Sequence, residues 1–201
     1  MAWAAVAVLA LVLAGLRLHA GLNPGVHTAP APSGLRAYGT ALPLVTAPLF
    51  SLPLATGGTL SLQALRGSSV VLVFVSPQAA DAARTAALAH DVALEVPAGV
   101  HVLAVDSTAS SSIASFATWA AGQGLPPQVQ LLSGGPAASG TVDAAYHLGS
   151  DAEGTTLLPV AATYLIDPQG RERWVLSTAA TAAAVPAEAH ALAVAAIALR
   201  P

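Results

Sequence analysis

The chain has 201 residues, of which 55% are hydrophobic and only 8% are charged, and its formal net charge is −3. This length fits one domain of ordinary size plus an additional segment, and the apolar composition excludes a disordered chain. All seven basic residues are arginines scattered along the sequence, which predicts no basic surface and no nucleic-acid partner. The absence of cysteine excludes disulfides, thiolate metal sites and thiol-based catalysis.

The N-terminal segment, residues 1–22, is expected to be a membrane anchor or a signal peptide. Residues 2–16 are uninterrupted apolar residues or glycine, and with Arg17 reaching toward the interface the apolar stretch extends to about 21 residues, near the length that spans a bilayer. An uncleaved anchor is favoured over a cleaved signal or a buried helix, because no basic residue precedes the stretch and no good cleavage site follows it. We therefore expect residues 2–22 to lie in the membrane of the cell as a single span. The domain is expected on the extracytoplasmic side, although Arg17 and Arg36 favour the opposite orientation.

The rest of the chain divides into a tether and a domain. Residues 23–46 are rich in proline and glycine and show no hydrophobic period, which predicts a tether. From residue 47 to residue 201 the pattern becomes regular and predicts an α/β fold in which a mixed central sheet lies between helices, as in thioredoxin. Strands are expected at 59–62, 70–75, 100–105, within 125–132, at 161–166 and at 173–176, helices at 77–96, 111–121, 142–147 and 187–199, and a surface loop at 133–140.

Several ordered motifs of this domain match a known superfamily. They are residues 47–52 (APLFSL), 57–67 (GGTLSLQALRG), 105–107 (VDS), 132–134 (LSG), 144–148 (AAYHL) and 163–170 (TYLIDPQG). The first two resemble the opening of redoxins, which have a thioredoxin-like fold, and the others resemble the Sco/SenC proteins within that superfamily. The resemblance covers residues 47–176. It implies a membrane-anchored copper chaperone of cytochrome c oxidase assembly.

The chain departs from this family at the positions that bind copper. The resemblance places the two cysteine ligands of the family at Ala79 and Ala83 and the histidine ligand at Pro159, while the acid between the cysteines is kept as Asp81. We therefore expect no metal and no cofactor. The residues 74–77 (FVSP) also resemble the loop of TlpA-like thiol oxidoreductases, whose two cysteines would fall on Ala79 and Ala82.

No other catalytic motif occurs in the sequence, so we predict no enzymatic activity and no catalytic residue. The interpretation we favour is a redox-inactive binding or assembly module for a respiratory oxidase subunit or a cysteine-bearing paralogue. A degenerate TlpA/redoxin-like oxidoreductase relative and a structural envelope protein are the alternatives. The residues expected to form a partner-binding loop are Pro77, Gln78, Asp81, Arg84 and His147.

Overall fold

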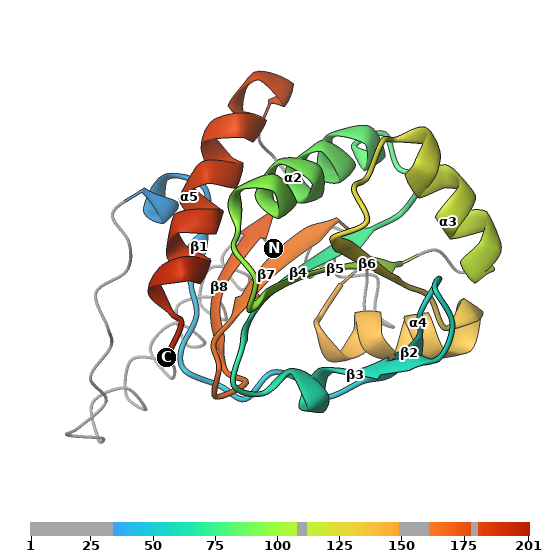
Figure 1. Cartoon of the computed structure of the whole chain (residues 1–201), viewed down its shortest axis with the longest axis horizontal. Helices are drawn as coiled ribbons and strands as arrows, with labels where there is room; N and C mark the ends of the chain where they lie inside the picture. Colours follow the sequence, from blue (N-terminus) through green and yellow to red (C-terminus); the bar gives the residue numbers. More distant parts are fainter. Residues whose placement is uncertain (1–33, 108–111, 149–160, 178–180) are drawn as a thin grey trace, which may run out of the picture. The chain divides into compact units, whose positions relative to one another are not determined.

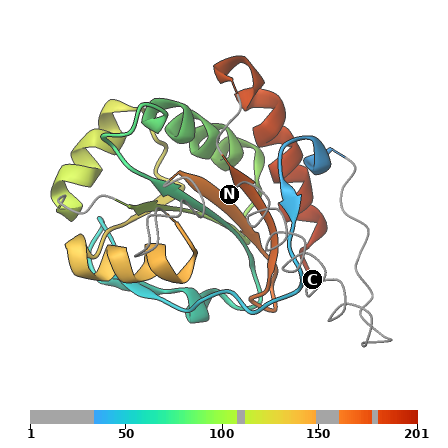
Figure 2. The same cartoon turned by 180° about the vertical axis from the view of Figure 1, so that it is seen from behind.

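A computed structural model describes residues 34–107, 112–148, 161–177 and 181–201, and Figures 1 and 2 show it from two sides. Eight strands occur in this part of the chain, and the helices include three short 3-10 turns, labelled η. The strands are β1 (Thr40–Ala41), β2 (Ser51–Pro53), β3 (Thr59–Ser61), β4 (Ser69–Val75), β5 (Val100–Asp106), β6 (Val129–Leu132), β7 (Ala162–Ile166) and β8 (Glu172–Ser177). The helices are η1 (Leu35–Ala37), η2 (Leu62–Leu65), α2 (Ala82–Glu95), α3 (Ile113–Gly122), α4 (Gly135–Ala145), η3 (Ala182–Ala184) and α5 (Val185–Ala198).

Six strands form a mixed central sheet in the order β1-β8-β7-β4-β5-β6, and β2 pairs with β3 in a separate two-stranded sheet. Strands β4, β5 and β6 run parallel to one another, whereas β7 is antiparallel to β4 and to β8. The apolar runs predicted as buried strands are β4, β5 and β7, and the predicted hairpin partner is β8. This is a thioredoxin-like α/β fold, as the sequence predicts.

The two faces of the sheet bury different layers (Figure 1). On β4, Val71, Val73 and Val75 pack on the side of α2, α3 and α5, whereas Leu72 and Phe74 pack on the side of α4 and the β2–β3 sheet. Because alternate residues of a strand point to opposite faces, a strand covered on both sides must be apolar throughout. This explains the continuous run of valine, leucine and phenylalanine in β4.

Two predicted elements are wrong in detail. Residues 133–140 were expected to be a surface loop, but α4 begins at Gly135 and continues to Ala145, because proline is well tolerated in the first turn of a helix. The helix expected from residue 77 begins only at Ala82, since backbone hydrogen bonds from Ala79 to Ser76 and from Ala82 to Ala79 form turns first. The loop before α2 is therefore longer than predicted.

Part of the predicted tether belongs to the folded domain. Leu35 is fully buried in the core beside α5, and β1 pairs with β8. Gly39 approaches β8 so closely that a Cβ there would lie 2.6 Å from the carbonyl oxygen of Val175. The folded part therefore begins well before residue 47, and the tether prediction is wrong for the residues that the structure describes before that position.

The predicted membrane segment, residues 1–22, lies outside the described residues. Among the residues that are described, no helix is both long and apolar enough to span a bilayer.

Candidate functional site

The candidate site lies at the edge of the sheet where β4 and β5 end. The backbone N–H of Ser107 donates a hydrogen bond to the carbonyl of Val75 at 2.9 Å, which holds the two strand ends together. The chain leaves β4 through turns at residues 76–81 and enters α2 on one face of the sheet. In folds with parallel strands, this carboxyl edge is the usual place for a binding site.

The described positions at which the Sco/SenC resemblance places copper ligands offer no ligand atom. Ala79 is half-buried in the turn before α2, and Ala83 is exposed in the first turn of that helix; Pro159 lies outside the described residues. A methyl group cannot coordinate a metal ion. Throughout the described residues, no group of three or more histidine and acidic side chains is close enough to hold a metal. The described residues of this loop therefore do not fit copper.

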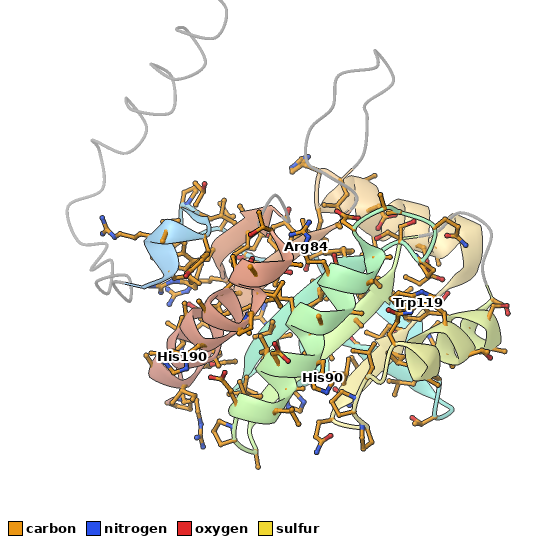
Figure 3. All side chains as sticks on the ribbon, turned by 90° about the horizontal axis from the view of Figure 1, so that it is seen from above. Arg84, His90, Trp119 and His190 are labelled. Atoms are coloured by element: carbon orange, nitrogen blue, oxygen red, sulfur yellow. The ribbon has the colours of Figure 1, made fainter. Side chains whose placement is uncertain are left out.

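An open groove of about 850 Å³ lies beside this turn, between the start of α2 and the segment that leads into α5. Small side chains dominate its lining. Two charged residues of the predicted partner-binding loop, Asp81 and Arg84, also line it, and an ion pair of 3.7 Å joins them. Figure 3 shows Arg84 at the junction of α2 and α5. The groove residues are Ala80, Asp81, Ala83, Arg84, Ala87, Thr181, Ala182 and Val185.

The structure does not bring the whole predicted loop together. Pro77 is half-buried and Gln78 is exposed in the turn, and neither lines the groove. His147 is exposed after the end of α4, on the opposite face of the sheet from α2, and it also does not line the groove. Its φ of 56° is a left-handed conformation that glycine adopts more easily after a helix.

A buried carboxylate near the groove was not predicted. Glu188, in the first turn of α5, is only 1% exposed, and its Oε1 atom has no hydrogen-bond partner in the described structure. Burial raises the pKa of Glu188, and the positive charge of Arg84 partly opposes that increase. In the sequence, Glu188 is an isolated glutamate in an alanine-rich helix, and this pattern predicts an exposed side chain.

A second polar cluster joins the sheet edge to α4. Asp106, at the end of β5, is fully buried and accepts a hydrogen bond from the Ser133 hydroxyl at 3.1 Å. Asp143 of α4 accepts one from the Ser107 hydroxyl at 3.0 Å. Burial raises the pKa of Asp143 to about 6; the Ser107 hydrogen bond lowers it, and the nearby Asp106 raises it further. These contacts connect residues far apart in the sequence, so the sequence pattern could not predict that Asp143 lies at this edge.

Two histidines on the face covered by α2 and α5 lie away from the groove. His90, on α2, contacts Asp91 at 2.9 Å, and His190, on α5, contacts Glu95 at 2.7 Å. Figure 3 places both at some distance from Arg84. They make pairwise surface contacts.

Known structures with this fold include thiol oxidoreductases, peroxidoxins and Sco proteins. A Chlorobium tepidum protein described as the thiol:disulfide interchange protein DsbE is 20% identical with a TM-score of 0.60, and the match covers 81% of this chain and 100% of that one. Peroxidoxin BcpB from Mycobacterium tuberculosis is 23% identical with a TM-score of 0.59, covering 79% and 97%. Copper-bound ScoI from Bradyrhizobium japonicum is 17% identical with a TM-score of 0.53, covering 73% and 98%. A comparison with curated protein sequences found no match.

The fold and these likenesses define a thioredoxin-fold protein. Residues 44–175 match the AhpC/TSA family, so the chain belongs to that family of redoxins. The Sco structure is no more similar than the DsbE and peroxidoxin structures. The comparisons therefore support the redoxin family as a whole.

Proposed function

We propose that this chain is a Sco/SenC-like redoxin that works by binding a protein partner, tethered to the extracytoplasmic face of the cell membrane, in the biogenesis of a respiratory cytochrome oxidase. One observation carries the proposal: the redoxin fold is intact around β4 and α2, yet the chain has no cysteine. Thiol chemistry and thiolate metal binding require a sulfur atom. Without thiol chemistry, the surface around β4 and α2 supports the binding of a protein partner.

The groove beside α2 supports this role. Ala80, Ala83 and Ala87 line the groove with small methyl side chains, so a partner side chain has room to enter beside the helix. Asp81 and Arg84 add one charge of each sign to the lining of the groove, which favours a polar and oriented contact over a purely apolar one. Such a surface suits transient recognition of a folded partner.

The Sco-like part of the proposal rests on the motifs around Asp106, Ser133 and Tyr164. A Sco relative with this fold, BsSco, is described as a member of a family of cytochrome c oxidase assembly proteins, and it is 13% identical to this chain with a TM-score of 0.55. By this analogy we infer that the partner is an oxidase subunit or a cysteine-bearing paralogue that carries the metal.

Site-specific photocrosslinking tests the proposal. The full chain is produced in its native cells with a photoreactive phenylalanine analogue at position 83, in the groove, or at position 198, an exposed alanine at the end of α5. We expect position 83 to give an adduct that mass spectrometry identifies as an oxidase subunit or a Sco-like paralogue, and position 198 not to give it. Adducts only with disulfide-bonded substrates would favour an oxidoreductase relative. The same adducts from both positions would contradict a role for the groove.

A further inference from the structure

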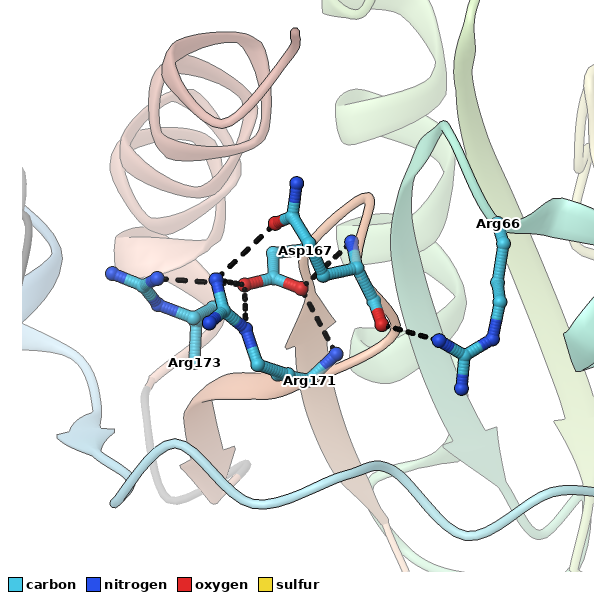
Figure 4. Close-up of polar contacts among 5 residues, drawn as sticks. Arg66, Asp167, Arg171 and Arg173 are labelled. Atoms are coloured by element: carbon cyan, nitrogen blue, oxygen red, sulfur yellow. Dashed lines mark hydrogen bonds and ion pairs between the residues drawn. The ribbon is translucent and has the colours of Figure 1, made fainter. Parts of the chain in front are cut away.

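The fold gathers positive charge at the end of the molecule opposite the candidate site. The turn between β7 and β8 lies at the N-terminal end of β4, because Ile166 pairs with Val70. Three of the seven arginines meet at this turn around Asp167 (Figure 4). The sequence predicted no basic surface, since Arg66 is about a hundred residues away from Arg171 and Arg173 in the chain. That prediction is wrong for this end of the domain.

Among the residues that the structure describes, only one carboxylate contacts these guanidinium groups. Asp167 is 2% exposed and accepts hydrogen bonds from Arg171 Nε at 2.9 Å and Arg173 at 3.4 Å. Arg66 instead donates to the backbone carbonyl of Gln169 at 2.7 Å, and within the described residues it has no carboxylate partner. Arg66, Arg171, Arg173 and Asp167 together carry a net charge of +2 on a chain whose net charge is −3, and the neighbouring Glu172 is buried at 8% exposure.

Exposed apolar side chains lie beside the arginines. Leu49 is 56% exposed and borders a shallow depression together with Arg66 and Gly170. Val45 is 47% exposed, and its carbonyl accepts a hydrogen bond from the backbone of Glu172. Arg66, Arg171, Val45 and Leu49 are here called the hairpin patch; the Arg173 side chain is only 12% exposed and stays paired with Asp167.

We propose that the hairpin patch binds the anionic lipid headgroups of the membrane surface. Arginine matches the planar oxygen pairs of phosphate with several directed donors, and anionic headgroups attract basic residues near the surface. Exposed leucine and valine beside them can enter the boundary between headgroups and acyl chains. The proposal rests on the membrane tether of the proposed function, but it concerns a different surface from the groove.

Two observations favour lipid over an acidic polypeptide. The apolar side chains are exposed beside the charges, whereas an acidic polypeptide needs only the charges. In addition, the segment that follows the proposed tether runs along β8 toward the turn from residue 40, and Thr46 bridges Arg171 there. Binding by this patch orients the groove away from the bilayer, because Asp81 and Arg84 lie at the opposite edge of the sheet.

The absence of cysteine makes a fluorescence test specific, because one introduced cysteine carries the only label. Ala64→Cys places an environment-sensitive dye on η2, exposed and two residues from Arg66; Ala80→Cys places it at the opposite edge. The full-length chain is reconstituted in phosphatidylcholine vesicles with or without 30% phosphatidylglycerol, with a lipid-borne quencher present. Each labelled chain is also made with Arg66→Gln, or with Arg36→Gln, an exposed arginine outside the patch.

We expect strong quenching at position 64 and weak quenching at position 80 in anionic vesicles, and a loss of quenching at 64 in high salt. Arg66→Gln should weaken this surface association on the order of fivefold, whereas Arg36→Gln should not. Equal quenching in neutral and anionic vesicles, or equal quenching at both positions, would overturn the proposal. A dye response to soluble polyglutamate as large as that to anionic vesicles would assign the patch to an acidic polypeptide instead. None of these results depends on whether the groove binds an oxidase subunit.

Discussion

At the residue scale, Asp143 is the most informative titratable group of the candidate edge. Burial raises its pKa from 3.8 to about 6, so between these pH values the folded chain keeps a proton that the unfolded chain releases. The free energy of unfolding should therefore fall as the pH rises from about 4 to 6. Because the side chain is only partly buried, we expect the fall to be about 1 kcal/mol.

Asp143→Asn should remove this fall and stabilise the protein above pH 6. Urea unfolding at pH 4 and pH 7 measures the effect, and carbon NMR of the Asp143 carboxyl group measures the titration directly. A carboxyl group that titrates near pH 4 would show that the contact with Asp106 and the burial are weaker than the structure indicates.

Asp167 is the residue that organises the β7–β8 turn. Its Oδ1 accepts from the backbone N–H groups of Gln169 and Arg171, and its Oδ2 contacts Arg171 and Arg173. Asp167→Ala removes both sets of bonds and leaves partly buried donors unpaired, so we expect a loss of about 3 kcal/mol in unfolding free energy. Asp167→Asn keeps the carbonyl acceptor for the backbone and should lose less. Equal losses in urea unfolding would mean that only the charge matters.

At the scale of an element, the side chains of β4 pack into the hydrophobic core on both faces of the sheet. Phe74 is fully buried and contacts Tyr146 and Tyr164, with ring centroids 5.1 and 6.0 Å apart. Phe74→Ala should therefore lower the unfolding free energy by about 3–5 kcal/mol. Ala83→Ser, on the exposed start of α2, should change it by less than about 0.5 kcal/mol. Urea titrations of both variants check the pair, and comparable losses would show that the start of α2 is packed.

Substitutions in the turn before α2 and at the start of α2 test whether this region aligns with the copper loop of the Sco proteins. Ala79→Cys together with Ala83→Cys restores two thiolates where the family has them, and thiolates favour Cu(I). We expect the double variant to bind one Cu(I) ion in competition with a chelator and the original chain to bind none. A double variant that circular dichroism shows to be folded but that binds no Cu(I) would contradict the alignment.

The sequence predicted the strands better than the loops around them. β4, β5 and β7 are covered on both faces, and this burial requires unbroken apolar runs that stand out in the sequence. Helix α4 was predicted only from residue 142, because Gly135 and Pro136 at its start have the composition of a turn. Its stability comes instead from Val142 and Tyr146, which pack under the sheet.

At the scale of the whole molecule, the sequence could predict which residue types are missing but not which residues meet. The resemblance to the Sco/SenC proteins placed the missing cysteine ligands at Ala79 and Ala83. The groove depends on the contact between α2 and the segment before α5, about a hundred residues apart. The hairpin patch likewise needs the pairing of β4 with β7 to bring Arg66 to Arg171. Such long-range contacts leave no local pattern.

The two ends of the sheet therefore carry different surfaces. The carboxyl edge holds the groove and the acids Asp81, Asp106 and Asp143, and the other end holds the hairpin patch. We propose that the end with the hairpin patch faces lipid and that the carboxyl edge with the groove faces a protein partner.

Complementation tests most directly whether the groove serves oxidase assembly without redox chemistry. Assembled oxidase is measured from the haem absorbance of membranes from cells that lack this chain and carry the original chain, Ala83→Trp or Ala198→Trp. Ala83→Trp fills the groove, whereas Ala198→Trp adds the same side chain outside it. We predict that the original chain and Ala198→Trp restore the oxidase and that a folded Ala83→Trp does not. Full restoration by Ala83→Trp, or an oxidase level that does not change when the chain is removed, would contradict the account.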